Sequence, residues 1–257
     1  MTALDWPHYL LLVVVGAVAS AINSVAGGGS LVSFPTLTLG LGIPSKIANA
    51  TNSVGLWPGS LGGALGFRNL LGATQHHLKT LLMPTVLGSV LGAWLLIQTK
   101  QRVFDAIVPA LILLAALLLA FQPQVKKWAL GHRQSLSTTT GVVLQFIVAT
   151  YGGYFGAGMG IMMLAAFALY MEGTIHEINA VKNWLGVAIN LVATAVFVSR
   201  GVVLFGPALA LMVGGIAGGF AGAKISQKMD PEKLRIGIAV YGVVTAAYFA
   251  KQYWFGG

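Results

Sequence analysis

The chain has 257 residues, of which 56% are hydrophobic and only 8% are charged, and its mean hydropathy is +0.82. A soluble domain carries about 25% charged residues, so the composition excludes a water-soluble globular protein, a disordered chain and a nucleic-acid partner. The net charge of +9 is spread over single residues and short clusters. The chain has no cysteine, which excludes disulfides, thiolate metal sites and thiol catalysis. The composition indicates a polytopic protein of the lipid bilayer.

Long runs without a charged residue follow one another along the chain, at 6–45, 47–67, 80–99, 106–125, 134–171, 183–199, 201–223 and 236–250. A helix needs about 20 apolar residues to cross the hydrocarbon core, and six of these runs suit one crossing each. The runs 6–45 and 134–171 are too long for one crossing, since straight helices of that length would extend about 57–60 Å. Each of these two runs is therefore expected to break and fold back.

Glycine clusters mark where the two long runs are expected to break. The first run contains three glycines and a serine at 27–30, followed by Pro35, and the second contains glycines at 152–153 and again within 156–160. Glycine weakens a helix and permits unusual backbone angles. Such backbone is tolerated in a membrane only where protein or a water-filled cavity satisfies its polar groups. The breaks are thus expected to face the interior of the protein.

The two long runs head two similar halves. A shift of 131 residues lays Ala26 on Ala157, Gly29 on Gly160 and Asn52 on Asn183. Each broken segment is followed by three further apolar runs. The sequence therefore predicts an all-α membrane protein of two repeats, 1–121 and 138–257, joined by a basic linker at 122–137.

Charge bias predicts that the two repeats are inverted. If each long run crosses once, seven basic residues lie on each side; if each is a hairpin, nine lie on one side and five on the other. The larger group marks the cytoplasm, which places the linker inside and both termini outside. A hairpin plus three crossings is an odd unit, so the halves have opposite orientation, as in many transporters.

The residues at the two breaks resemble a known family. The segment 23–30 (NSVAGGGS), Pro35, the segment 39–44 (LGLGIP) and the segment 48–52 (ANATN) are similar to the first-half signature of the sulfite exporter TauE/SafE family. The second half echoes it at 152–160 and 179–183, although Ala166 stands where the repeat would place a second proline. The resemblance implies a bacterial inner-membrane transporter of small anions, especially sulfite and organosulfonates.

A small oxyanion needs hydrogen-bond donors, and a helix that restarts inside the membrane supplies free N–H groups and a positive dipole end. Lys182 adds a cation inside a core segment. The simpler alternatives are close packing by glycine, interhelical bonding by asparagine and a lysine that extends to the membrane surface. The candidate substrate-binding residues are Asn23, Ser24, Gly27, Gly28, Gly29, Ser30, Asn52, Ser53, Gly156, Gly158, Gly160, Lys182 and Asn183.

The sequence gives less support to other functions. Core segments contain no His-x-x-x-His pattern, carboxylate pair or nucleophile–base pair, which argues against an enzyme, a metal site or a bound cofactor. His76, His77 and His132 are expected to be solvated in cytoplasmic loops. The leading prediction is a secondary transporter of a small sulfur-containing anion. An anion channel with a glycine-lined filter and a membrane scaffold without a permeant remain alternatives, and the oligomeric state stays open.

Overall fold

A computed structural model describes residues 4–25, 28–66, 69, 71–132, 136–225 and 231–255, and all regular secondary structure in these residues is helical. The elements are α1 (Trp6–Val25), α2 (Ser30–Pro35), η1 (Thr36–Gly40), α3 (Ser45–Gly66), η3 (Gly72–Thr74), α4 (Gln75–Gln98), α5 (Gln101–Ala120), α6 (Gln122–Gly131), α7 (Thr138–Tyr154), α8 (Met159–Ala168), α9 (Ile175–Ser199), α10 (Phe205–Ile225) and α11 (Pro231–Trp254).

The helices have the length and composition of a membrane protein. In the described residues, five stretches are long and apolar enough to cross a bilayer: Trp6–Asn23, Gln75–Gln98, Gln101–Ala120, His176–Ser199 and Glu232–Trp254. Shorter apolar stretches lie in α2–η1, in α8 and in α10. The all-helical membrane class predicted from composition is confirmed.

Both over-long runs break at the predicted glycines. The first break separates α1 from α2 between Val25 and Ser30, and the second separates α7 from α8 between Tyr154 and Met159. The helix after the first break changes to π-helix directly after Pro35, whereas α8, which has Ala166 instead of a proline, stays α-helical. Proline has no N–H for the helix ladder, so Pro35 donates no bond to the carbonyl of Leu31, four residues earlier.

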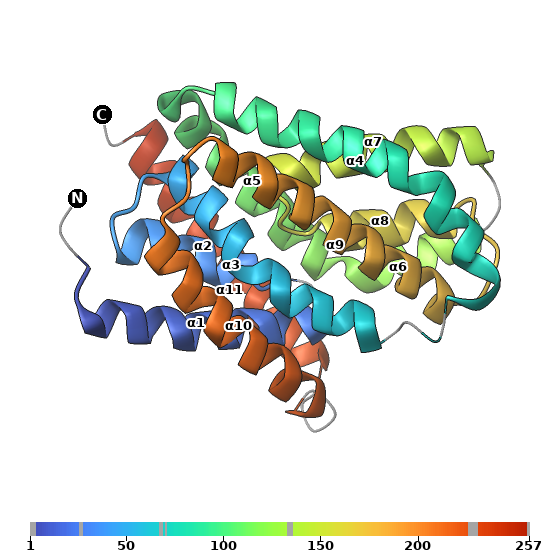
Figure 1. Cartoon of the computed structure of the whole chain (residues 1–257), viewed down its shortest axis with the longest axis horizontal. Helices are drawn as coiled ribbons and strands as arrows, with labels where there is room; N and C mark the ends of the chain where they lie inside the picture. Colours follow the sequence, from blue (N-terminus) through green and yellow to red (C-terminus); the bar gives the residue numbers. More distant parts are fainter. Residues whose placement is uncertain are drawn as a thin grey trace.

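Contacts between chain segments define two ends of the bundle. At the first, which we call the terminal end, the Lys46 ammonium of α3 donates to the carbonyls of Ile97 and Thr99 at the end of α4. The Trp254 indole of α11 donates to Ala106 of α5 at the same end. Figure 1 shows both chain termini on this side of the molecule.

The opposite end, which we call the linker end, gathers the connections before α4, α7 and α9. Leu136, just before α7, donates its N–H to the carbonyl of Leu169 after α8. Gly173, in the α8–α9 connection, lies against Thr74 before α4. The hairpin of α1 and α2 therefore opens toward the terminal end, and the hairpin of α7 and α8 opens toward the linker end (Figure 1).

Small residues allow the helices to approach closely. In α10, a Cβ added at Gly214 or Gly218 would overlap the carbonyl oxygens of Val13 and Ala17 in α1. In α4, a Cβ added at Gly92 would overlap the carbonyl oxygen of Thr150 in α7. Glycines four residues apart bring membrane helices into backbone contact, so they position the two hairpins against α10 and α4.

These contacts predict unequal effects of glycine-to-alanine changes. Gly214→Ala and Gly92→Ala force backbone shifts and are expected to lower the free energy of unfolding by about 1–3 kcal/mol. Thermal unfolding in detergent should then fall by roughly 2–4 °C per kcal/mol. Gly237→Ala in α11, where a Cβ meets nothing within 4 Å, is the matched control and should leave the midpoint unchanged or slightly higher. Equal midpoints for all three variants would contradict the proposed packing role.

Candidate substrate site at the two helix breaks

An asparagine satisfies the backbone at the first break. The N–H of Gly29 donates to the Asn23 Oδ1 at 2.7 Å, and the Gly29 carbonyl accepts from the N–H groups of Val32 and Ser33. Asn23 at the end of α1 thus provides an acceptor for the N–H of Gly29, the residue that precedes the restarted helix. A Cβ at Gly29 would overlap the carbonyl oxygen of Ala19, so glycine is required for this close return of the chain.

The second break is built from glycines with left-handed backbone. Gly156 and Gly158 have φ angles of 80° and 79°, which other residues adopt only with strain. The Met159 N–H donates to the Gly156 carbonyl at 3.2 Å. The Tyr151 hydroxyl donates to the Ala157 carbonyl at 2.6 Å. The turn between α7 and α8 is therefore held by its own backbone and by one side chain of α7.

The two breaks lie against the same turn of α5. Gly28 packs on the side chain of Leu119, and Gly158 packs on Ala115 and Leu118. Four residues of helix span about 6 Å, so the breaks lie at nearly the same depth in the bundle. In addition, Phe34 of α2 makes an edge-to-face contact with Phe155 of the second break at a centroid distance of 5.5 Å.

Lys182 of α9 lies beside the second break. A Cβ added at Gly160 would lie 3.9 Å from Lys182 Cδ, so the aliphatic stem of this half-buried lysine runs along the first turn of α8. Among the described residues, no carboxylate pairs with Lys182. Both the ammonium and the start of α8 are positive, and together they favour an anion.

The asparagines of α3 and α9 have different surroundings. Asn49 donates its Nδ2 to the Tyr154 carbonyl at 2.9 Å, which satisfies the last turn of α7. Asn52 lies on the same face of α3, is 2% exposed, and its Oδ1 has no partner among the described residues. Asn183 is half-buried in α9. The described contacts bring neither Asn52 nor Asn183 into hydrogen bonding with a break.

The remaining predicted residues have simpler positions. Ser30 is the first residue of α2 and is half-buried. The Ser53 hydroxyl donates to the Asn49 carbonyl within α3 at 3.0 Å. Ser24 belongs to α1, and Gly27 lies outside the described residues. Two polar residues outside the predicted set hold the second break: Asn49 donates to the Tyr154 carbonyl, and Tyr151 donates to the Ala157 carbonyl.

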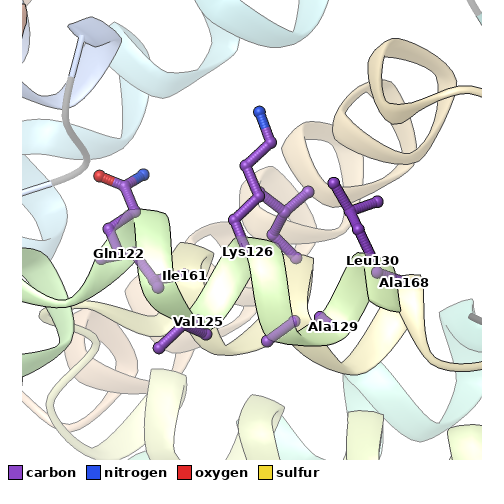
Figure 2. Close-up of a pocket in the computed structure, with 9 residues that line it drawn as sticks. Gln122, Val125, Lys126, Ala129, Leu130, Ile161 and Ala168 are labelled. Carbon is purple, nitrogen blue, oxygen red and sulfur yellow. The ribbon is translucent and has the colours of Figure 1, made fainter. Parts of the chain in front are cut away.

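A groove near the second break is too small for a substrate. It lies between α6 and α8, and Figure 2 shows Lys126 extending away from the α6 ribbon beside it. Its volume of about 10 Å³ is close to the minimum that one water molecule needs. We therefore regard it as a packing seam between the linker helix and the second hairpin. The residues that line it are Gln122, Val125, Lys126, Ala129, Leu130, Ile161, Leu164, Ala165 and Ala168.

Broken hairpins that meet inside a bundle of membrane-length helices are an architecture that many polytopic membrane transporters share. The sequence profile described as "Sulfite exporter TauE/SafE" matches residues 12–249. The chain belongs to this family, and it is a multi-pass protein of the bacterial inner membrane.

Similar proteins support the same class. A "Probable membrane transporter protein" of Haemophilus influenzae is 28% identical over 95% of this chain and 96% of its own length. "Probable membrane transporter protein YfcA" of Escherichia coli K12 is 24% identical over 92% of this chain and 87% of its own length. "Probable membrane transporter protein ORF9" of Sinorhizobium sp. is 24% identical over 93% and 91%. No solved structure matches the chain.

The bond between Asn49 and the second break generates a stability prediction. Asn49→Leu leaves the buried Tyr154 carbonyl without this donor, which should cost about 1–3 kcal/mol of unfolding free energy. Ser53→Ala, on the same helix, removes only a bond to a carbonyl of its own helix and is the matched control. Thermal unfolding of the two purified variants compares them. An Asn49→Leu protein as stable as Ser53→Ala would mean that this bond does not hold the break.

Proposed function

We propose that this protein is a secondary transporter of small sulfur-containing anions, such as sulfite, a sulfonate or a related organosulfur anion. The anion binds near the membrane midplane, at the restarted helices between two inverted repeats. The observation that carries the proposal is the convergence of both breaks on one turn of α5, with Lys182 beside the second. Membership in the TauE/SafE family supports both transport and this substrate class.

The helix contacts support the proposed repeats, 1–121 and 138–257, joined by the linker 122–137. If α1–α5 correspond to α7–α11 in order, the contact of α1 with α10 corresponds to that of α7 with α4. The contact of α3 with α10 then corresponds to that of α9 with α4. The contact of α3 with α9 and the contact of α5 with α11 each join two corresponding helices, so the exchange of the halves leaves both contacts unchanged. Such a pattern is expected from a two-fold axis in the membrane plane, which relates inverted repeats.

The proposed site suits a tetrahedral oxyanion. The Gly29 N–H already donates to Asn23, so the first break contributes the neighbouring groups of Gly28 and Ser30. The second break contributes the first turn of α8, and Lys182 contributes a point charge. Asn52 lies one turn from Asn49. When its side-chain amide rotates, Nδ2 takes the place of the unpartnered Oδ1 and can donate to the anion. The proposed set also includes four residues because of their positions in the sequence: Ser24, Gly27, Ser53 and Asn183.

The membrane potential supports export. An anion that leaves a cell with a negative interior gains about 2.3 kcal/mol per charge for each 100 mV. Export down this field needs no further driving ion. Uptake of the same anion would need one.

Counterflow in proteoliposomes tests the function. Vesicles loaded with sulfoacetate should accumulate labelled sulfite faster than empty vesicles, because a carrier returns to its starting state faster when loaded on both sides. Acetate-loaded vesicles are the matched control and should not accelerate uptake. Uptake without acceleration indicates a channel, and absence of uptake for sulfite, thiosulfate and sulfoacetate indicates a protein without these permeants. Either result rejects the proposal.

Lys182→Gln tests the charge of the site. A lysine that faces the permeant attracts a divalent anion more strongly than a monovalent one. At a pH where sulfite is divalent, the variant should therefore raise the apparent Km for sulfite at least several-fold more than it raises the apparent Km for a monosulfonate. Lys182→Arg should restore part of the difference. Lys251→Gln, at the exposed end of α11, is the control. Equal changes for both anions would place Lys182 away from the permeant.

A further inference from the structure

A second group of buried polar side chains lies between α4, α7 and the α8–α9 connection. We call it the polar track; its members are His77, Thr85, Ser89, Gln145 and Tyr170, with exposed fractions between 0% and 7%. The sequence-based expectation that His77 is solvated in a loop is wrong. His77 belongs to the first turn of α4 and is covered by Tyr170, which lies 6.2 Å away between ring centroids.

The polar track runs along one face of α4. His77, Thr85 and Ser89 are separated by multiples of four residues, with the buried Leu81 between the first two. This spacing keeps them on one side of the helix. Twelve residues of helix extend about 18 Å, so the track leads from the linker end to roughly the middle of the bundle.

Contacts from α7 and α9 continue the track. The ring of Tyr170 lies against Gly141, one turn before Gln145. The Gln145 Nε2 donates to the Thr85 hydroxyl at 2.8 Å. The Ser89 hydroxyl donates to the Ile189 carbonyl of α9 at 2.8 Å.

The inner end of the track adjoins the second helix break. A Cβ at Gly153 would overlap the Ser89 carbonyl, and Gly152 packs on Ile189 and Met159. Met159 is the first residue of α8. The track therefore ends next to the proposed anion site.

Three atoms of the track have no hydrogen-bond partner among the described residues: His77 Nε2, Tyr170 Oη and Gln145 Oε1. Buried polar atoms in proteins nearly always bond to protein or to bound water. Three unsatisfied atoms at successive positions of one buried strip point to water molecules that bridge them.

The packing itself does not require polar residues here. The corresponding pair, α1 and α10, packs equally closely through Gly214 and Gly218, with the fully buried Leu211 and with Val15. Interhelical hydrogen bonds account for Thr85, Ser89 and the Gln145 amide nitrogen, but they leave the three unpartnered atoms of the track unexplained.

We propose that the polar track holds a chain of water molecules that conducts protons between the linker end and the second helix break, with His77 as the titratable group at its entrance. A proton binds to the His77 imidazole, which passes it to the adjacent water as the proton moves along hydrogen bonds; only N–H and O–H bonds form and break. The groups that face His77 are His76 on α4, with ring centroids 3.9 Å apart, and Tyr170 and Glu172 after α8. The coupling of protons to anion movement rests on the proposed function, whereas the water path does not.

Silver accessibility tests the water path without any transport assay. The natural chain has no cysteine, so Thr85→Cys and Gln145→Cys each introduce one thiol. Ag⁺ reaches a thiol only through water, and its binding is measured by protection from a fluorescent maleimide added after denaturation. We expect Thr85→Cys to react at least tenfold faster than Leu211→Cys, the matched control, whose site is also 0% exposed. If both track thiols react as slowly as the control, the water path is rejected.

The pH dependence of counterflow tests the role of His77. With a sulfonate, whose charge does not change between about pH 6 and 8, the wild-type rate should follow a histidine titration. His77→Gln should flatten this profile, while the exposed neighbour variant His76→Gln should keep it. A profile that His77→Gln leaves unchanged rejects the proton role. Absence of anion counterflow in the wild type rejects the proposed function instead, and silver accessibility still decides the path.

Discussion

The requirement that every buried backbone polar group find a partner governs this structure. A helix interrupted inside a membrane exposes N–H and C=O groups that no water in the hydrocarbon region can satisfy. Here side chains supply the partners: Asn23 accepts from Gly29 at the first break, and Asn49 donates to Tyr154 at the second. Because Asn49 belongs to α3, the second break is tied to a helix more than 100 residues earlier. The breaks thus fix the arrangement of the helices as well as the place of the proposed site.

Local features of the sequence were sufficient to predict where the helices break. Run length and glycine clusters act within one segment, so the interruptions after Val25 and Tyr154 could be predicted without tertiary information. The partners of the breaks could not, because the bond from Asn49 depends on how α3 rotates against α7. His77 was mispredicted for a related reason. The uncharged run begins after Lys79, but α4 begins at Gln75 and the α8–α9 connection covers its first turn.

Two lysines lie at helix ends whose dipole charges have opposite signs. The Lys46 ammonium lies at the carboxyl end of α4, where it donates to the carbonyls of Ile97 and Thr99 at 2.5 and 2.9 Å. That end of a helix is negative, so this charge is matched by the fold. Lys182 runs instead along the first turn of α8, where the dipole is positive. An anion bound there would match this charge, which is why Lys182 belongs to the proposed site.

The two proposed repeats share their packing but differ in chemistry. Both hairpins contact a glycine-containing helix of the opposite half, yet Lys182 and the polar track occur only beside the second hairpin. In an inverted arrangement, rocking of the two halves exposes the site first to one side of the membrane and then to the other. Exactly symmetric halves would give both sides the same affinity for the anion. With Lys182 and His77 both placed near the second hairpin, the two exposed states of the proposed transporter bind the anion in different electrostatic surroundings, and in the proposed mechanism this difference allows protonation at the linker end to favour release on one side.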